Sequence, residues 1–538
     1  MKFGNQIFRL MFFVTSVVLF FACSKKELPR PNILLIVADD MNYDSPGFAG
    51  GVAPDVTPNI DRLAGQSFSF TKAFSAVSVC QPSRQSMLSG LLPNHYGSAG
   101  FFPMADGTPT LPSILREAGY LTGNIHKEHH MLPIEAFNWH YNNERLGLTA
   151  GDAVVGRDPE GMAEAFRSFI NIADDEKKPF FMIVNSADPH RPFHGDPVKP
   201  GSWYWGYDEI NLPEPSRVYT AEEVNVPPNL PDLPGIRKDL AKYASSVRRL
   251  DDAVGKCLKV LEDLDKDKST LVMFVADNGM PLPYAKFDCY LSSNRTSLLM
   301  RWPELIQSPK IDNEHLVSLM DITPTVLELT GMQAPSNLDG KSLVPFLQNQ
   351  VPENWRESIV FLRNDDIYYP SGIKGALKRD PDFIKKLEAI GWVPRPDHPH
   401  EGTYSREKEM RAFYDGKYGY VYNHCYSDEV IKPEQLGAIV PYGDPAFNAM
   451  KFASKQDSII KERYDFYLQR KQEELYDWTT DPGSRNNLID DPQYAEVLSK
   501  ARNGLLQWLK TNNDPLAEDF QYMFESTKWD KSNSKLKN

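Results

Sequence analysis

Cysteine, net positive charge and long hydrophobic runs are all scarce in this sequence. Five cysteines are spread over 538 residues and no two of them form a CxxC pair, which argues against a disulfide scaffold and a cysteine-rich zinc site. The formal net charge is −13, whereas broad nucleic-acid binding requires a basic surface. We therefore expect no nucleic-acid partner, although a local cationic pocket is still compatible with an anionic ligand.

The N-terminus is typical of a targeting signal rather than of part of a fold. Basic residues precede an apolar run over 10–22, which suits a signal-peptide core but is short for a membrane helix. The run ends Phe20-Phe21-Ala22-Cys23-Ser24, which resembles a loose bacterial lipobox; a cleaved signal with an incidental cysteine is the alternative. We expect a lipoprotein signal peptide over 1–23, a tether over 24–30, and an exported protein in the periplasm or at the cell surface. Cys23 would join it to a lipid of the outer or inner membrane.

The remaining composition is that of an ordinary globular protein, with 41% hydrophobic and 24% charged residues. The length suits one large domain and a smaller one. Cys257 lies in a helical run and is expected in the core. A bridge between Cys289 and Cys425 is compatible with an exported protein, and the sequence leaves that pairing open.

Cys80 lies in a stretch, 78–90, that reads SVCQPSRQSMLSG. Pro82 restricts its own φ and biases the residue before it toward an extended conformation, which predicts Cys80 on a loop just before a helical run over 84–88. Backbone N–H groups at such a helix start favour an anion, and Arg84 adds a positive charge. The alternative is a free cysteine that packs as a small buried hydrophobe.

Paired oxygen-bearing side chains follow two continuous apolar runs. Such runs are typical of strands buried on both faces of a parallel sheet, and functional residues lie just beyond their carboxyl ends. An exposed turn is the alternative, but hard divalent cations prefer clustered carboxylate oxygens. The pairs are Asp39 and Asp40 after 33–38, and Asp277 and Asn278 after 271–276.

Basic side chains follow further strand-like runs. The strand predicted over 120–125 leads into His126-Lys127-Glu128-His129-His130, a stretch also compatible with a solvated loop or a transition-metal site. Lys127 and His129 alternate, so they would point the same way from an extended chain. The run over 180–185 leads to Asp188-Pro189-His190-Arg191, and Lys286 follows the second oxygen pair.

Together these motifs resemble the sulfatase family. The family signature is Cys-x-Pro-Ser-Arg ending in Ser/Thr-Gly, and the opening PNILLIVADD, the ADPHR stretch and DNGMPLPYAK match further family motifs. Lys127 and His129 fall on the family's catalytic lysine and histidine. His126 and Glu128 depart from the family's usual glycine and tryptophan, which changes the local pocket shape.

The resemblance implies a chemistry for these residues. A maturation enzyme would oxidise Cys80 to formylglycine, whose hydrate attacks sulfur and later expels sulfate. A bound Ca²⁺, rather than Mg²⁺, would be held by Asp39, Asp40, modified Cys80, Asp277 and Asn278. Arg84, Lys127 and Lys286 would neutralise the sulfuryl group, His129 would poise the diol, His190 would protonate the leaving atom, and Arg191 and Lys286 would contact substrate.

Within the family, the ADPHR, PPNLPD and DNGMPLP stretches look most like the heparan N-sulfatases (sulfamidases). Animal sulfamidases carry arginine at the position of Lys286. A lysine at this position is typical of O-sulfatases. The expected partner is a sulfated saccharide, with N-sulfoglucosamine of the glycosaminoglycans heparin and heparan sulfate favoured. The alternatives are an O-sulfatase for another host or algal polysaccharide, a phosphatase or phosphonate hydrolase of the same superfamily, and a catalytically silent glycan-binding lipoprotein.

We expect an α/β protein with the alkaline-phosphatase-like sulfatase fold. This fold has a large mixed β-sheet sandwiched by helices and a smaller C-terminal α+β subdomain with an antiparallel sheet. The catalytic domain is expected over 31–375 and the subdomain over 376–538. An amphipathic helix is predicted over 236–264, a hairpin over 410–422, and an ordered insertion above the active-site face over 195–234.

Overall fold

The computed structural model describes residues 29–98, 100, 102–148, 152–196, 212–364, 409–424 and 445–525. The predicted signal peptide, the lipidation site Cys23 and Cys425 lie outside these residues. Among the described residues, no helix has the length and apolarity required to cross a membrane. The predictions for the N-terminus therefore stay predictions.

A large mixed sheet forms the centre of the molecule. Its strands, in spatial order, are β3 (Leu121–Ile125), β4 (Phe180–Asn185), β1 (Asn32–Ala38), β5 (Thr270–Ala276), β6 (Arg295–Arg301), β2 (Phe68–Phe74) and β7 (Lys310–Asp312), with β8 (Val317–Ser318) also paired to β2. The first four are mutually parallel, whereas β6 runs antiparallel to both of its neighbours. The central strands are buried on both faces, which explains their continuous apolar runs.

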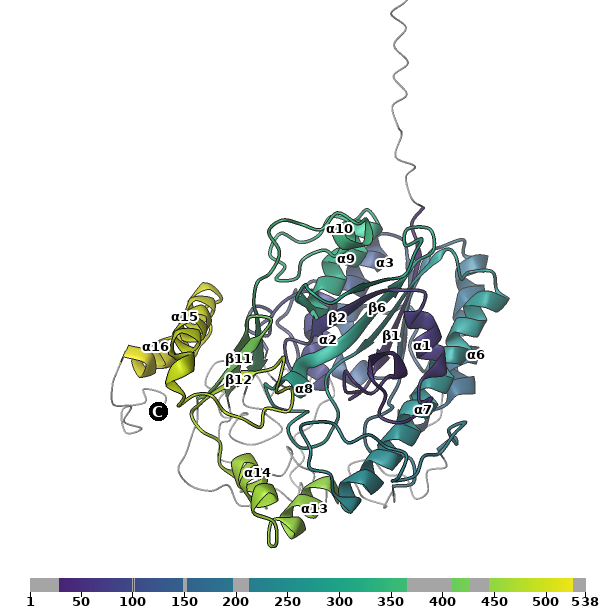
Figure 1. Ribbon diagram of the computed structural model, residues 1–538. Helices are drawn as coiled ribbons and strands as arrows, with labels where there is room; N and C mark the ends of the chain where they lie inside the picture. Colours follow the sequence, from purple (N-terminus) through teal and green to yellow (C-terminus); the bar gives the residue numbers. More distant parts are fainter. Residues whose placement is uncertain are drawn as a thin grey trace, which may run out of the picture.

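Helices cover both faces of this sheet (Figure 1). Side chains of α1 (Pro58–Ala64), α6 (Pro159–Asp175) and α7 (Pro234–Asp263) pack on one face. Side chains of α2 (Cys80–Ser89), α3 (Leu111–Glu117) and α9 (Ile322–Leu329) pack on the other. Because successive strand residues point to opposite faces, Leu34 and Ile36 of β1 belong to the first core, and Ile33 and Leu35 belong to the second.

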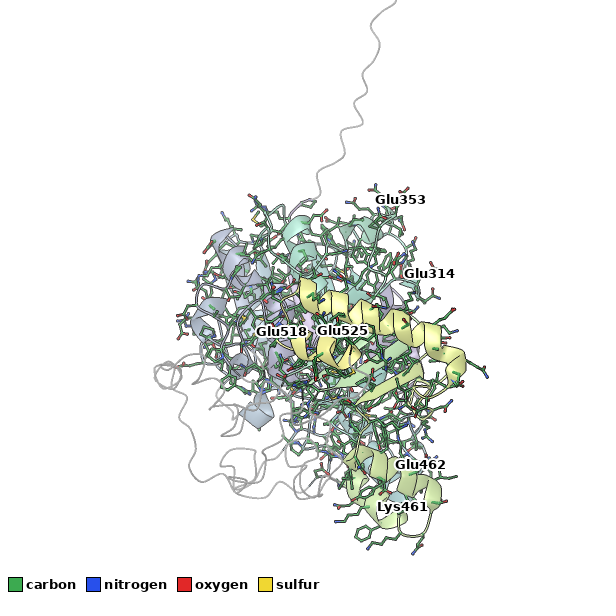
Figure 2. The ribbon with its side chains drawn as sticks, turned by 90° about the vertical axis from the view of Figure 1, so that its left-hand side faces the viewer. Glu314, Glu353, Lys461, Glu462, Glu518 and Glu525 are labelled. Atoms are coloured by element: carbon green, nitrogen blue, oxygen red, sulfur yellow. The ribbon has the colours of Figure 1, made fainter. Side chains whose placement is uncertain are left out.

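Four C-terminal strands form a separate antiparallel sheet. They are, in spatial order, β12 (Glu473–Asp477), β11 (Tyr418–Asn423), β10 (Met410–Tyr414) and β9 (Ile359–Arg363). Phe361 and Tyr414 on one face pack against Phe74 of the large sheet. The other face is covered by α15 (Ala495–Thr511) and α16 (Ala517–Glu525), which cross the view in Figure 2 with Glu518 and Glu525 at the surface.

Shorter elements complete the described chain. They are η1 (Gly47–Ala49), η2 (Glu128–His130), α4 (Ile134–Phe137), α5 (Asp152–Val155), α8 (Leu291–Asn294), η3 (Leu319–Asp321), α10 (Val344–Leu347), α13 (Pro445–Ala453), α14 (Ser458–Leu468) and η5 (Pro492–Tyr494). Residue 375, the expected domain boundary, lies outside the described residues. The structure places β9, which precedes that point in the chain, with the C-terminal strands.

Most expected elements are confirmed, including the α/β architecture, the hairpin of β10 and β11, and the long helix α7. The start of α2 differs from the prediction, because the helix begins at Cys80 itself. Pro82 then lies in the first turn, where its missing N–H costs no intrahelical hydrogen bond. Of the expected insertion, residues 212–233 are irregular, and Asn225 N donates to Val52 O (2.8 Å).

Candidate active site

Two adjacent strands bring four oxygen-bearing side chains to one edge of the large sheet. Asp39 and Asp40 directly follow β1, and Asp277 and Asn278 directly follow the parallel neighbour β5. Asp277 N donates to Ala38 O (3.1 Å), and Asp40 N donates to Asp277 Oδ1 (3.0 Å). All four side chains are completely buried. The two sequence pairs therefore form one cluster, as predicted.

Gly279, directly after this cluster, lets two backbone segments approach closely. A Cβ atom at this position would lie 1.9 Å from the carbonyl oxygen of Ser292. No other residue type fits so close an approach of two backbone segments.

The cluster has the donor set of a cation site. Oxygens of Asp39, Asp40 and Asp277 lie within 4.8 Å of one another. Asn278 Oδ1 is buried without a hydrogen-bond donor, and the buried Asp39 carboxylate is contacted by the cationic side chains of Lys127 and Arg84. Buried polar atoms of this kind are costly unless a partner neutralises them. A hard divalent cation fits these oxygen ligands.

The electrostatics of the cluster support the same assignment. Burial raises the pKa of Asp277 to about 7, and the nearby carboxylates of Asp39 and Asp40 add to this effect against the opposing Arg84. Burial also acts to raise the pKa of Asp39, but neighbouring cations, Lys127 foremost, hold it well below its usual range. Three carboxylates in one buried site thus repel one another unless positive charge is supplied.

Cys80 is the first residue of α2 and lies beside this cluster. Lys286 Nζ donates to Cys80 Sγ (3.0 Å), and the thiol lies 3.7 Å from Asp40 Oδ1. Burial and the Asp39 carboxylate raise the pKa of the Cys80 thiol well above its usual value. The expectation that the helix start favours an anionic cysteine is therefore wrong for the unmodified thiol, because burial and the nearby carboxylates outweigh the helix terminus.

Three cations surround the carboxylates. Arg84 Nη2 lies 2.8 Å from Asp277 Oδ2 and 3.6 Å from Asp39 Oδ1. Lys127 forms an ion pair with Asp39. Lys286 Nζ lies 2.7 Å from Asp40 Oδ1, and burial, which acts to lower its pKa, is outweighed by Asp40, so that the pKa is raised well above its usual value. Burial likewise acts to lower the pKa of Arg84, but neighbouring carboxylates raise it above its usual value, so Arg84 and Lys286 keep their positive charge at neutral pH.

The segment that carries Lys127 is turned rather than extended. Lys127 has φ 57° and ψ 22°, and a short 3₁₀ helix, η2, follows it. Lys127 and His129 therefore do not alternate along a strand as expected, because tertiary packing imposes the turn. Lys127 is buried, whereas His129 is exposed with its ring edge-to-face on the buried His130 at 4.3 Å between centroids.

His190 reaches the cluster from the loop after β4. Its Nε2 lies 3.6 Å from Asp40 Oδ2, and its Nδ1 lies 2.5 Å from the carbonyl of Arg191. Burial lowers the pKa of His190 to about 4, so the imidazole is neutral near pH 7. Because Nδ1 must carry the proton that bonds the carbonyl, the Nε2 lone pair faces the site.

Arg191 has a different environment from the one expected of a substrate contact. Its guanidinium binds both carboxylate oxygens of Asp239 on α7 (3.2 and 2.5 Å) and lies 3.4 Å from Asp196. It also lies over the Phe193 ring at 4.1 Å. These contacts make Arg191 part of the packing between the loop and α7, and its role toward substrate stays a prediction.

Sequence reasoning missed two groups that hold the site. Asn185, at the end of β4, accepts a hydrogen bond from Arg84 and donates to Asn124 Oδ1 (2.9 Å). Asp188 pairs with Arg249 through both oxygens (2.7 and 2.9 Å) and with Arg157 (3.2 Å). A polar residue that ends a buried strand was the available signal for Asn185.

The structure thus brings most of the predicted residues together at one strand edge. They are Asp39, Asp40, Cys80, Arg84, Lys127, His190, Asp277, Asn278 and Lys286. A buried α/β strand-end site that combines one cysteine, clustered carboxylates and fixed cations defines an enzyme that acts on an anionic group.

Comparison with known proteins identifies the class. The sulfatase family model matches residues 31–332. The chain therefore belongs to the sulfatase family, and it is a hydrolase of sulfate esters or sulfamates. The motif-based prediction of the family and of the enzyme class is confirmed.

Similar proteins span nearly the whole chain. N-sulphoglucosamine sulphohydrolase of Homo sapiens is 29% identical over 90% of this chain and 91% of its own length. An ulvan-active sulfatase of Formosa agariphila is 24% identical over 91% of this chain and 76% of its own. A solved structure in complex with its substrate D-glucosamine-2-N,6-O-disulfate has a TM-score of 0.59 and 17% identity over 90% of this chain and 99% of its own, which confirms the fold.

Proposed function

We propose that this sulfatase removes sulfate from sulfated glycans and that N-sulfoglucosamine of heparin or heparan sulfate is its favoured target. The observation that carries the proposal is the convergence of Cys80, Lys286 and the carboxylate cluster in one buried site. Similarity to the human N-sulphoglucosamine sulphohydrolase over nine tenths of the chain supports the choice of sugar.

The nucleophile in this proposal is formylglycine at position 80, made by a maturation enzyme. The unmodified thiol is buried and neutral, so it is a poor nucleophile in its own right. When hydrated, the aldehyde supplies one hydroxyl that attacks sulfur and a second that later expels sulfate. The location of Cys80 between Lys286 and Asp40 would place such a hydroxyl next to both a cation and a carboxylate.

The cation in this proposal is Ca²⁺, with Mg²⁺ as the weaker candidate. Its ligands would be Asp39, Asp40, Asp277, Asn278 and the modified residue 80. When bound, a hard divalent cation acts as a Lewis acid toward oxygen ligands and balances their charge. The unpaired Asn278 Oδ1 and the clustered oxygens of Asp39, Asp40 and Asp277 support this ligand set.

The remaining side chains would stabilise charge and move protons. Arg84, Lys127 and Lys286 are fixed by carboxylates before substrate arrives, so they would neutralise the sulfuryl oxygens without reorganisation. His190 is neutral in the free protein, and an anionic group beside Nε2 would raise its pKa and let it protonate the leaving atom. The family resemblance also gives His129 the role of poising the nucleophile and Arg191 a place in the substrate pocket. His129 is exposed beside His130, and Arg191 is bound to Asp239, so both roles rest on the resemblance alone.

The substrate test compares sulfate release from matched disaccharides. The matured enzyme is incubated with sugars sulfated only at the 2-N, 2-O or 6-O position, and released sulfate is measured by ion chromatography. We expect release from the N-sulfated sugar. Release from only the O-sulfated sugars would make this chain an O-sulfatase, the alternative that the similarity to the ulvan-active sulfatase supports.

The nucleophile test is mass spectrometry of the tryptic peptide that carries residue 80. Conversion of cysteine to formylglycine lowers its mass by about 18 Da, a change outside the usual series of thiol oxidations. We expect the shifted peptide in protein from a host with active maturation machinery. An unmodified peptide from such a host would instead favour a silent glycan-binding protein.

We also propose that the protein is an exported lipoprotein anchored through Cys23. The basis is the N-terminal charge, the apolar run over 10–22 and the cysteine that follows it. The test is metabolic labelling with an alkyne fatty acid. Label should disappear in Cys23→Ala, and label that persists in that variant would contradict the proposal.

A further inference from the structure

One side chain of the cluster is carried by a loop of the large-sheet part that contacts the C-terminal subdomain. Residues 279–290 lie in the connection from β5 to α8, and Lys286 points from this loop toward Cys80 and Asp40. Two residues further on, Asp288 is completely buried and binds side chains of the C-terminal subdomain. Tyr290, which precedes α8, donates to Glu474 of β12 (2.8 Å), and Figure 1 shows α8 on the side of the large sheet that faces the small sheet.

Arg470 is the main partner of Asp288. Its Nη1 and Nη2 each donate to one carboxylate oxygen at 2.8 Å, a two-pronged contact that fixes the direction of both side chains. The guanidinium also lies over the rings of Tyr290 and Tyr467 at 5.0 and 5.3 Å. Arg363 of β9 adds a third, longer contact to Asp288 at 3.4 Å.

The same short stretch is bonded to the segment that precedes Cys80. Phe287 N donates to Ser78 O (3.1 Å), and Ser78 Oγ donates to Asp288 O (2.5 Å). Phe287 itself has φ 65°, a sterically disfavoured conformation for a non-glycine residue. Since Phe287 links Lys286 to Asp288, this conformation persists only because contacts on both sides hold it.

We propose that Arg470 is a positioning residue: by fixing Asp288, it holds Lys286 in place against Cys80 and Asp40. Arg470 of the C-terminal subdomain would thereby act on the active site through Asp288. The effect on turnover rests on the proposed function, since it requires Lys286 to act on the sulfuryl group. The effect on the loop itself does not.

A double-mutant cycle separates positioning from general stability. The variants are Arg470→Gln, Lys286→Met and the pair, each as full-length matured enzyme. We expect Arg470→Gln to lower kcat/KM about 10- to 100-fold, as for a small misplacement of a reacting group. In the Lys286→Met background, Arg470→Gln should lower kcat/KM by less than about 3-fold, because the ammonium group that Arg470 positions is already absent. Equal losses in both backgrounds would overturn the proposal.

The matched control is Arg502→Gln. Arg502 of α15 also makes a two-pronged contact, to Glu473 at 2.7 and 2.7 Å, on the face of the small sheet that α15 covers. We expect its kcat/KM to stay within about 3-fold of wild type. If Arg470→Gln fails to fold, Arg470→Lys keeps the charge but loses the two-pronged geometry, and should show a smaller loss of the same kind.

Hydrogen exchange gives a readout that does not depend on turnover. The amides of Lys286 and Phe287 bond to Met280 O and Ser78 O, so they report directly on the loop. Arg470→Gln should speed their exchange, and Arg502→Gln should leave it unchanged. Unchanged exchange in Arg470→Gln would overturn the positioning role even if the enzyme proved inactive on every sulfated sugar, a result that would instead refute the proposed function.

Discussion

Lys286 Nζ lies 3.0 Å from Cys80 Sγ, closer than any carboxylate comes to that sulfur among the contacts described. The same ammonium lies 2.7 Å from Asp40 Oδ1, so it bridges the position of the nucleophile and the carboxylate cluster. The Lys286 side chain therefore adjoins both Cys80 and the carboxylate cluster, which makes Lys286 the most informative residue to change.

Lys286→Ala should lower kcat/KM about 10²–10³-fold, because one preorganised charge is lost from the site. Lys286→Arg keeps the charge and should retain more activity than Lys286→Ala. Steady-state kinetics with the preferred sulfated disaccharide measure both variants. The peptide carrying residue 80 must show equal conversion in all samples, and wild-type activity in Lys286→Ala would contradict the role.

Removal of divalent cations should destabilise the protein as well as inactivate it. The carboxylates of Asp39, Asp40 and Asp277 are clustered and buried, and a divalent cation would add positive charge beyond that of the three neighbouring basic side chains. A ligand at 100 times its Kd stabilises a protein by about 2.7 kcal/mol. Thermal unfolding should therefore show a lower Tm after chelation and recovery with added Ca²⁺. In Asp277→Asn the Ca²⁺-dependent rise should shrink, and an undiminished rise would place the cation elsewhere.

Asp251 should make stability depend on pH in the acid range. This buried carboxylate on α7 accepts hydrogen bonds from Asn59 N and Ile60 N at the start of α1, and burial raises its pKa from 3.8 to about 6. The folded state therefore binds the proton more tightly than the unfolded state. The stabilisation from this bound proton is complete below about pH 3.8 and is lost as the pH rises through about 6. The free energy of unfolding should fall by roughly 2–3 kcal/mol over this range.

The test compares wild type with Asp251→Asn by chemical denaturation from pH 4 to pH 7. The unfolding free energy of wild type, relative to the variant, should fall across this range because the variant does not titrate. A constant difference would mean that Asp251 has the same pKa in both states.

The ion pairs of Asp188 with Arg249 and Arg157 should contribute strongly to the stability of the fold. Asp188 and Arg249 are both almost completely buried, and the carbonyl of Asp188 accepts a hydrogen bond from Asp39 N (3.1 Å). Arg249→Met should cost about 3–5 kcal/mol, because it leaves a buried carboxylate short of its main partner.

Denaturant unfolding measures the loss, with Arg167→Met as control. Arg167 pairs with Asp263 at the surface, so its removal should cost at most about 1 kcal/mol. Similar losses of unfolding free energy in the two variants would show that the Asp188–Arg249 pair contributes no more to stability than an exposed ion pair.

Much of the fold could be predicted because its signals are local. A strand buried on both faces must be apolar at every position, so β1, β4 and β5 are visible as continuous runs. The long helix α7 is visible from its periodicity, since one face must meet the sheet. The helix begins at Pro234, two residues before the predicted start at 236, because proline suits the first turn of a helix.

The turned geometry around Lys127 could not be predicted from its neighbours. Alternation along a chain sets side-chain direction only if the backbone stays extended, and here φ is positive at both His126 and Lys127. Gly156 packs so closely that a Cβ there would lie 2.5 Å from His126 Nδ1. Packing between segments distant in sequence thus chose the backbone conformation.

The sequence by itself determined which chemical groups this protein holds and that they follow strand ends, because strand burial and turn chemistry act over a few residues. Only the tertiary structure decided which groups meet. Lys286 and Cys80 are far apart in the chain, as are Asp288 and Arg470, and their contacts depend on how whole elements pack. The neutral state of the Cys80 thiol is likewise a property of burial among carboxylates, which no local motif encodes.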